Sequence, residues 1–308
     1  CIPPVLKHAV TAGIGLFIAF IGLANAGIVV NGATILQLGN LTDPLVLLTL
    51  FGLILAGILL AKNVKGAFLL AMVVVSAIGM VAGLVQIPNA IVSAVPSIKP
   101  IFMQALSVPM DQIFSFDMVV VVFTFLFVDL FDTVGCLVGV ASKGDMLDEN
   151  GKLPKAKQAL FADAIGTTIG ALIGTSTVTA YVESASGIGE GGRTGLTSIT
   201  TGVMFLLALF FAPIFTSIPT QATAPVLILV GVMMASSLTK IDFNDFTNAI
   251  PAFLTFAMMP LAYSIADGII FGIISFTVLK LATNKKSEVN LSLILLSILF
   301  ILKFVFLK

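Results

Sequence analysis

Three carboxylates lie inside stretches that carry no other charged side chain. Asp129 and Asp132 occur in FTFLFVDLFDTVGCLVGVA, and Glu183 occurs in TSTVTAYVESASGIG. A charged side chain at bilayer depth is costly, so such acids normally face the interior of a helix bundle or a water-filled cavity. A buried carboxylate can accept paired N–H donors from a ligand, and a buried acid can carry a proton. The three acids therefore indicate a substrate or ion pathway, and hence a transporter.

The stretch with the two aspartates reads as a helix with one small-residue face. Asp129 and Asp132 are three residues apart and share a helical face, which Gly135 and Gly139 continue. Small residues at this spacing let another backbone approach closely. The next apolar stretch repeats the pattern, so we expect two helices that pack tightly around the carboxylates; its glycines are Gly166, Gly170 and Gly174.

The residues after Gly174 predict irregular backbone. The run GTSTVTAYV is rich in β-branched residues, which favour an extended strand, and ESASGIG can form only a short helix. Neither piece spans a bilayer alone, and irregular backbone at membrane depth is tolerated where it is buried in protein or lines a cavity. We expect a short strand and a half-helix with Glu183 near the N-terminus of the half-helix. A loop outside the membrane with an exposed Glu183 is the alternative, as is a purely structural role for Asp132.

Composition excludes most other classes of protein. Of the 308 residues, 58% are hydrophobic and 10% are charged, whereas soluble domains carry about 25% charged residues. The mean hydropathy is +1.17. The formal net charge is zero and no basic patch is present, which argues against nucleic-acid binding. Cys1 and Cys136 have no metal-ligand or disulfide-framework spacing. The sequence indicates an integral membrane protein, and because it starts with Cys rather than Met we expect an N-terminally truncated chain.

Apolar runs near the length of a membrane-spanning helix recur along the chain. A crossing needs about 20 apolar residues. The predicted spans are residues 6–30, 45–61, 66–85, 118–141, 158–173, 194–213, 223–238, 249–264, 267–282 and 291–306. The last run is either an added span or a helix that lies on the membrane surface.

The positions of the basic residues predict the orientation. If Lys7 is cytoplasmic, alternation of the spans puts the other loop cations on the same side, apart from Lys99, provided that the stretch around Glu183 counts as one crossing. A weak echo between the hairpins that start at Leu48 and Leu254 fits either an inverted repeat or the shared composition of apolar hairpins.

Three stretches together resemble one transporter family. FVDLFDTVGCLVGVA, GTSTVTAYVESASGIGEGGRTG and AGIGLFIAFIGLANAGIVV are similar to the adenine/guanine/hypoxanthine permease (AzgA-like) branch of the xanthine/uracil (nucleobase/ascorbate) permease superfamily. The resemblance covers nearly the whole chain and is most specific at the first two stretches.

The resemblance implies an all-α fold of fourteen membrane segments in two inverted repeats of seven, with a core and a gate domain. In each repeat the third segment is a short strand followed by a half-helix, and the substrate lies between the two half-helices. The first four segments are then absent from this chain. The implied division is a first half of the gate at 1–86, a connection at 87–116, the second half of the core at 117–213, the second half of the gate at 214–283 and a C-terminal apolar helix at 284–308.

The resemblance also implies roles for individual residues. The family's essential acids fall on Asp129 and Glu183, which would bind a purine, and one of the two would take part in proton coupling. We expect the neighbours of Glu183 to line the substrate site, and further polar residues to support coupling. The first group is Tyr181, Val182 and Thr179, and the second is Asp132, Asp163 and Thr133.

The function implied is import of hypoxanthine, guanine or adenine by proton symport, with an elevator-type motion of core against gate. We expect the chain not to be an enzyme, to need no cofactor or metal, to contact a purine and membrane lipid, and to allow a homodimer. An anion transporter of the sulfate-permease type is the alternative on the same fold, although the acids would repel its ligand. An intramembrane aspartyl protease is a second alternative, for which Gly187 to Glu190 is only a near match to the Gly-x-Gly-Asp setting.

Overall fold

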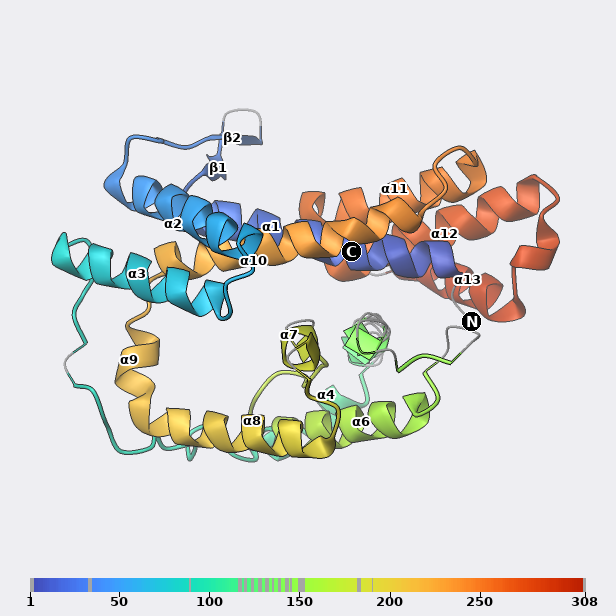
Figure 1. Cartoon of the computed structure of the whole chain (residues 1–308). Coiled ribbons are helices and arrows are strands. Elements are labelled where there is room, and N and C mark those ends of the chain that lie inside the picture. The colour runs from blue at the N-terminus through green and yellow to red at the C-terminus, as the bar shows by residue number, and fades with distance from the viewer. Residues whose placement is uncertain are drawn as a thin grey trace.

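The computed structural model shows a chain built almost entirely from helices in two layers (Figure 1). It describes residues 3–32, 35–88, 90–115, 118, 121–122, 125–126, 129–130, 133–134, 136–137, 140–141, 144, 146–148, 153–181, 184–189 and 191–306. The predicted α-helical membrane class is confirmed, and most of the predicted spans coincide with helices.

The first layer combines segments from both ends of the sequence and lies at the top of Figure 1. Helix α1 runs through its middle, with α10 and α11 beside it and α12 next to α11. The helices of this layer are α1 (Pro4–Asn25), α2 (Pro44–Ala61), α3 (Ala67–Val81), α10 (Thr220–Ala235), α11 (Phe246–Leu261), α12 (Ile265–Ala282) and α13 (Leu291–Phe306), and the short helices η3 (Ser236–Lys240) and η4 (Lys286–Glu288) belong to it as well.

Glycines allow the central helices of this layer to touch at their backbones. A Cβ atom added to Gly231 of α10 would lie 2.4 Å from the carbonyl oxygen of Gly15 in α1. A Cβ atom at Gly268 of α12 would lie 2.3 Å from Cγ of Met259 in α11. Small residues at helix contacts in membranes permit such close approach, and van der Waals packing then stabilises the pair.

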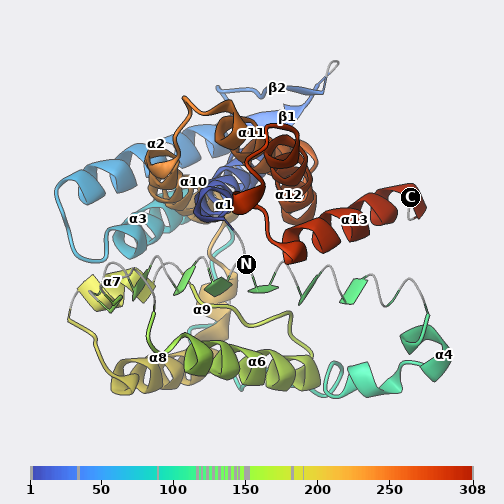
Figure 2. The same cartoon turned by 90° about the vertical axis from the view of Figure 1, so that its right-hand side faces the viewer.

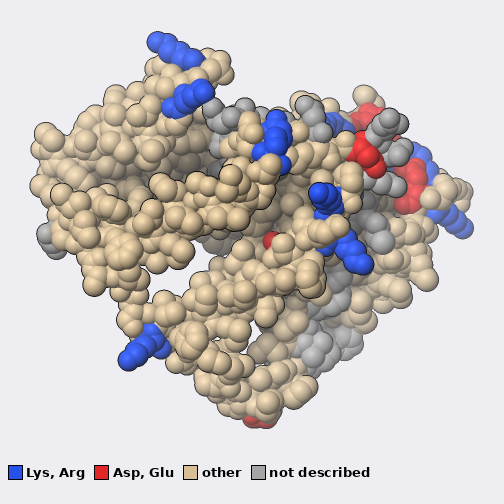
Figure 3. All heavy atoms as spheres, turned by 60° about the horizontal axis from the view of Figure 1, so that its bottom comes forward, with Lys and Arg blue, Asp and Glu red and all other residues tan. Residues whose placement is uncertain are grey.

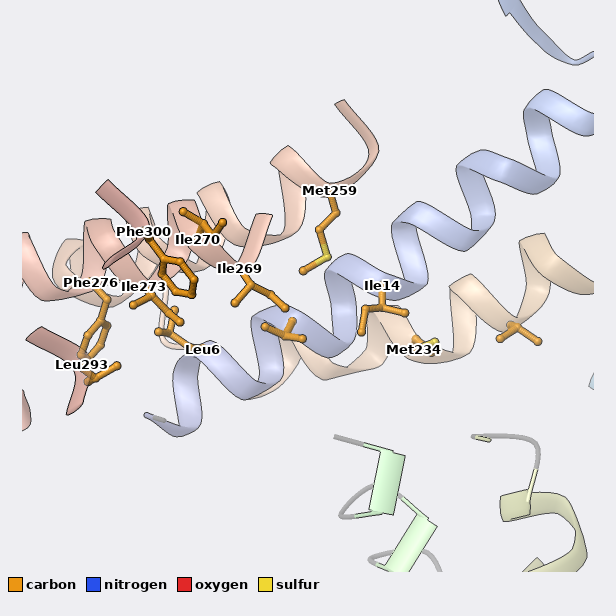
Figure 4. Packing of buried hydrophobic residues seen from close by; sticks show 12 residues of the cluster. Leu6, Ile14, Met234, Met259, Ile269, Ile270, Ile273, Phe276, Leu293 and Phe300 are labelled. Carbon is orange, nitrogen blue, oxygen red and sulfur yellow. The ribbon is translucent and has the colours of Figure 1, made fainter. Parts of the chain in front are cut away.

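The core of the first layer is a cluster of buried apolar side chains (Figure 4). Leu6 and Ile14 of α1 belong to this cluster together with residues from α10, α11, α12 and α13. Because the cluster draws side chains from helices at both ends of the sequence, it joins the two parts of the chain that form this layer.

The second layer comes from the middle of the sequence and lies at the bottom of Figure 1. The connection 87–116 runs into it. Helix α7 and the described residues of 118–141 lie between the two layers (Figure 2), and α9 leads back to the first layer. The elements are η1 (Gln104–Ser107), α4 (Met110–Ile113), α6 (Ala156–Ile173), α7 (Ser184–Gly189), α8 (Gly195–Ala208), η2 (Leu209–Phe211) and α9 (Ala212–Thr216).

Two sequence-based expectations about local structure were wrong. The first span was predicted to reach residue 30, but α1 ends at Asn25, where Gly27 takes a positive φ of 72°. Strands β1 (Val29–Asn31) and β2 (Leu36–Leu38) follow and pair antiparallel, with Val29 opposite Leu38. A strand was also expected before Glu183, yet residues 175–181 form no assigned strand, because a strand needs a ladder partner.

Length and composition fit a protein that crosses a membrane. Among the described residues, four helical stretches are long and apolar enough to cross: Pro4–Asn25, Pro44–Ala61, Gly195–Thr216 and Thr220–Lys240. Large apolar side chains cover the outside of these helices, and α8 is an example. In Figure 3 charged side chains occupy only a few places on the visible face. Such a surface suits contact with lipid rather than water.

Candidate functional site

Helix α6 presents one face of small and polar residues. Four residues recur at spacings of three, one and three, which puts them on the same side of the helix: Asp163, Gly166, Thr167 and Gly170. A face without large side chains leaves room for a backbone segment to lie directly on the helix. The sequence predicted this glycine-rich face, but not which segment covers it.

The segment that covers this face is the irregular stretch after α6. The hydroxyl of Thr167 donates to the carbonyl oxygen of Val178 at 3.0 Å and accepts from the Val178 backbone N–H at 3.1 Å. A Cβ atom at Gly170 would lie 2.8 Å from Oγ1 of Thr175. The two glycines of α6 that face it, Gly166 and Gly170, therefore receive the chain's own unwound segment. The other glycine-rich face, at Gly135 and Gly139, lies outside the described residues.

Thr133 joins the first acidic stretch to α6. Its side chain is only 1% exposed, and its Oγ1 donates to Oδ2 of Asp163 at 3.2 Å. Thr133 is four residues after Asp129, which puts both side chains on one helical face. This face is thus directed at the polar side of α6.

Asp129 is placed beside these groups with one oxygen unpaired. Its carboxylate feels the charge of Asp163, and the hydroxyl of Thr177 lies near it. Oδ1 of Asp129 is buried and has no hydrogen-bond partner in the described part of the chain. A buried acceptor without a donor costs about 1 to 3 kcal/mol, and more when it is charged. An N–H donor or a proton that reached Oδ1 would therefore be bound favourably.

The structure thus brings together Asp129, Thr133 and Asp163, three of the residues singled out in the sequence. Thr179 is half-buried on the segment that leads to α7, and Tyr181 is 67% exposed there, so its ring is free to contact another group. The remaining candidates, Asp132, Val182 and Glu183, lie outside the described residues.

Thr167 is the residue at this site that sequence reasoning missed. The hydroxyl residues after Gly174, Thr177 among them, are by their types suited to two roles, as ligand donors or as partners of the broken backbone. Thr167, which precedes this run, satisfies the backbone of Val178, and Thr177 lies near the carboxylate of Asp129. Only the register between α6 and the segment separates these roles, and nothing in the sequence sets it.

The C-terminal end of α7 is fixed by glycines and an arginine. Gly191 has a positive φ of 102°, and the N–H of Gly192 donates to the carbonyl oxygen of Gly187 at 2.9 Å. The guanidinium of Arg193 donates to the carbonyl oxygens of Ile188 and Gly192. A cation at this end complements the negative end of the helix dipole. The half-helix is therefore anchored at the end opposite to residue 183.

Comparison with known proteins gives the family. The model of the Permease family (Xan_ur_permease) matches residues 1–300. The chain belongs to this permease family. It is 48% identical to a putative permease of Methanocaldococcus jannaschii over all of the chain and 70% of that protein. It is 47% identical to the guanine/hypoxanthine permease PbuG of Bacillus subtilis, again over all of the chain and 70% of that protein. The adenine permease AdeP of Escherichia coli is 44% identical over 99% of the chain and 68% of its own length.

Membership of this permease family confirms several sequence-based predictions. The resemblance to the purine permease branch is confirmed, because the relatives include guanine/hypoxanthine and adenine permeases. The permease is a multi-pass protein of the cell membrane and not an enzyme, so the reading as an intramembrane protease is wrong. The reading as an anion transporter gains no support from the match.

Proposed function

We propose that this permease imports the purine nucleobases guanine, hypoxanthine and adenine, with Asp129 as a substrate-binding acid. The names of the relatives support the choice of purines. The observation that carries the proposal is the buried, unpaired Oδ1 of Asp129 beside Thr177 and Asp163. The edge of a purine carries N–H groups. A charged carboxylate accepts stronger hydrogen bonds from such donors than a neutral acceptor does.

The residues that follow Thr177 would complete the substrate site in this proposal. Thr179 and Tyr181 lie on the same segment as Thr177, and the exposed ring of Tyr181 could stack on a purine. Glu183 and Val182 come next in the sequence, and Glu183 would accept a second set of N–H groups. Arg193 supports this arrangement because it holds the far end of α7.

Proton symport is the coupling that the neighbouring acids support. Two carboxylates at membrane depth repel one another, and one proton removes the repulsion. Asp129 and Asp163 are such neighbours, and the Thr133 hydroxyl provides a donor to one of them. A proton bound with the purine and released on the other side would couple the two fluxes, with H⁺ as the coupling ion and no further cofactor. Asp132 would assist this coupling.

An elevator-type motion would move the second layer against the first. The first layer has the buried core and the helix pairs in backbone contact, which favour a rigid scaffold. The site residues belong to 118–141, which lies between the layers, and to α6 and the segment after it (Figure 2). In this proposal the first layer is the gate, the second layer is the core, and a homodimer would form through the gate.

The experiment is uptake of labelled guanine, hypoxanthine, adenine and uracil by the full-length permease in cells without their own nucleobase permeases. We expect purine uptake that a proton uncoupler abolishes. Asp129→Asn should lower this uptake at least about tenfold, since the loss of about 1.4 kcal/mol of binding free energy corresponds to a factor of ten. The control Asp111→Asn removes an exposed acid of α4 and should transport normally. Normal uptake by Asp129→Asn at equal surface abundance would contradict the role of Asp129, and the absence of any purine uptake would contradict the substrate class.

A further inference from the structure

A lysine with no exposed surface lies in the last turn of α12, away from the site described above. The side chain of Lys280 is 0% exposed. Its Nζ lies 2.8 Å from Oε2 of Glu288 in η4 and 3.9 Å from Oδ2 of Asp245 before α11. It also lies 5.3 Å from the centroid of the Phe276 ring, one turn earlier in α12. A buried ammonium group is tolerated where opposite charges and a ring face surround it.

Asp245 connects this lysine to a second one. The Asp245 carboxylate caps α11 by accepting from the backbone N–H of Thr247 at 2.9 Å, and it accepts from Nζ of Lys285 at 2.7 Å. Two positive and two negative groups thus meet where the ends of α11 and α12 approach η4, which leads into α13. We call Asp245, Lys280, Lys285 and Glu288 the ionic quartet. Its formal charge is zero.

The helix that follows the ionic quartet packs on α12 through a mixed face. Leu293, Ser297 and Phe300 recur at spacings of four and three residues, and all three are buried. The hydroxyl of Ser297 donates to Oγ1 of Thr277 in α12 at 2.9 Å. Interhelical hydrogen bonds of this kind contribute about 0.6 kcal/mol on average in a membrane, so the hydroxyl pair alone is a weak attachment.

We propose that the ionic quartet is a latch that keeps α13 attached to α11 and α12, so that α13 is a fixed part of the first layer. Lys280 is the centre of the latch, because it alone contacts an acid on each side, one before α11 and one before α13. Removal of one partner of a buried ion pair leaves an unpaired charge, which is far more disruptive than removal of both partners. Loss of Glu288 would leave the buried Lys280 without its near countercharge and would free the start of α13.

The latch explains the position of the last apolar run, for which the sequence left a crossing and a surface helix equally open. A helix held at its first turn by an ion pair, and along its length by Leu293, Ser297 and Phe300, packs on α12 instead of lying free on the membrane surface. The inference does not depend on the substrate of the permease, because it concerns only how this helix is held.

Hydrogen–deuterium exchange of the purified full-length permease, read by mass spectrometry, tests the latch. We expect Glu288→Gln to speed exchange of peptides from α13 at least about tenfold, since it leaves the buried charge of Lys280 without its near countercharge. Exchange in α2 should stay unchanged. The exposed Lys286 lies close in sequence but is not part of the ionic quartet, so Lys286→Met is the matched control.

Two further variants keep the inference falsifiable if Glu288→Gln does not fold. Lys280→Met removes the buried charge itself and leaves Glu288, which is 47% exposed, in contact with water, so we expect it to speed exchange in α13 less than Glu288→Gln does. The double variant Lys280→Met with Glu288→Gln removes both charges and should exchange more slowly than Glu288→Gln. The latch would be overturned if α13 exchanged in Glu288→Gln at the same rate as in the unmodified protein. It would also be overturned if the effects of the two substitutions on exchange in α13 were additive.

Discussion

Replacement of Thr133 by valine tests whether the contact between the first acidic stretch and α6 is part of the transport machinery. Valine has nearly the shape of threonine but lacks the hydroxyl, so it removes the hydrogen bond to Asp163 and leaves no cavity. The side chain is 1% exposed, so water cannot replace the lost donor at this position. The change therefore removes one interaction and little else.

The size of the effect follows from the kind of hydrogen bond. Thr133 donates to a carboxylate oxygen at 3.2 Å, and a hydrogen bond to a charged group contributes about 1.5 to 3 kcal/mol. Since about 1.4 kcal/mol corresponds to a factor of ten, the full loss would appear as roughly a tenfold to hundredfold lower uptake efficiency. The loss reaches this size only if Asp163 acts while charged during the transport cycle.

The assay is initial-rate uptake of labelled guanine, hypoxanthine and adenine, with KM and Vmax determined at equal surface abundance. Thr133→Ser keeps the hydroxyl and should retain most of the activity. Thr168→Val, at an exposed threonine of α6 that donates only to the carbonyl oxygen of Ala164 among the described partners, is the matched control. Uptake by Thr133→Val within about twofold of the unmodified permease would refute the reasoning, because the lost bond would then contribute less than about 0.4 kcal/mol.

Two predictions concern the first layer. Gly231→Ala would put a Cβ atom 2.4 Å from the carbonyl oxygen of Gly15, and we expect the free energy of unfolding in detergent to fall by about 1 to 3 kcal/mol; Gly57→Ala meets open space and should cause no loss. Lys285 lowers the pKa of Asp245 far below its ordinary value, and Asp245 raises the pKa of Lys285. The stability from Asp245 is therefore present above about pH 4, the ordinary carboxyl pKa, and is lost as the pH falls through the lowered pKa. Asp245→Asn should lower Tm at pH 7, with a difference that shrinks in acid; a difference that grows in acid would contradict this assignment.

Periodicity was sufficient to predict much of the helical fold. Apolar runs gave the positions of α2, α6 and α10 to within a few residues, because burial in a bilayer imposes both length and composition. The run at the end of α1 was misread, since an apolar strand in a short hairpin and the last turn of a membrane helix have the same composition. Only Gly27, which permits the positive φ after Asn25, indicated where the helix stops.

The candidate site was predictable where one helix carries the signal and unpredictable where two elements meet. The spacing predicted one face for Asp129 and Asp132, and the resemblance singled out Thr133 and Asp163, which the structure joins by a hydrogen bond. Which hydroxyl residue of the following segment reaches Asp129 depends on how that segment lies on α6. The register is set by the bonds between Thr167 and Val178, which no local pattern encodes.

The way in which the unwound segment is held has a consequence for how the site can move. Thr167 both donates to and accepts from Val178, so one side chain of α6 satisfies the backbone groups that a neighbouring strand would otherwise satisfy. The segment with Thr177 is therefore fastened to α6, whereas Asp129 and Thr133 belong to the preceding stretch. Among the described residues these bodies meet where Thr133 donates to Asp163 and where Thr177 lies near Asp129. Because each contact ends on a carboxylate, a change in the charge of either acid would alter how the bodies hold together, and proton binding would then act directly on the geometry of the site.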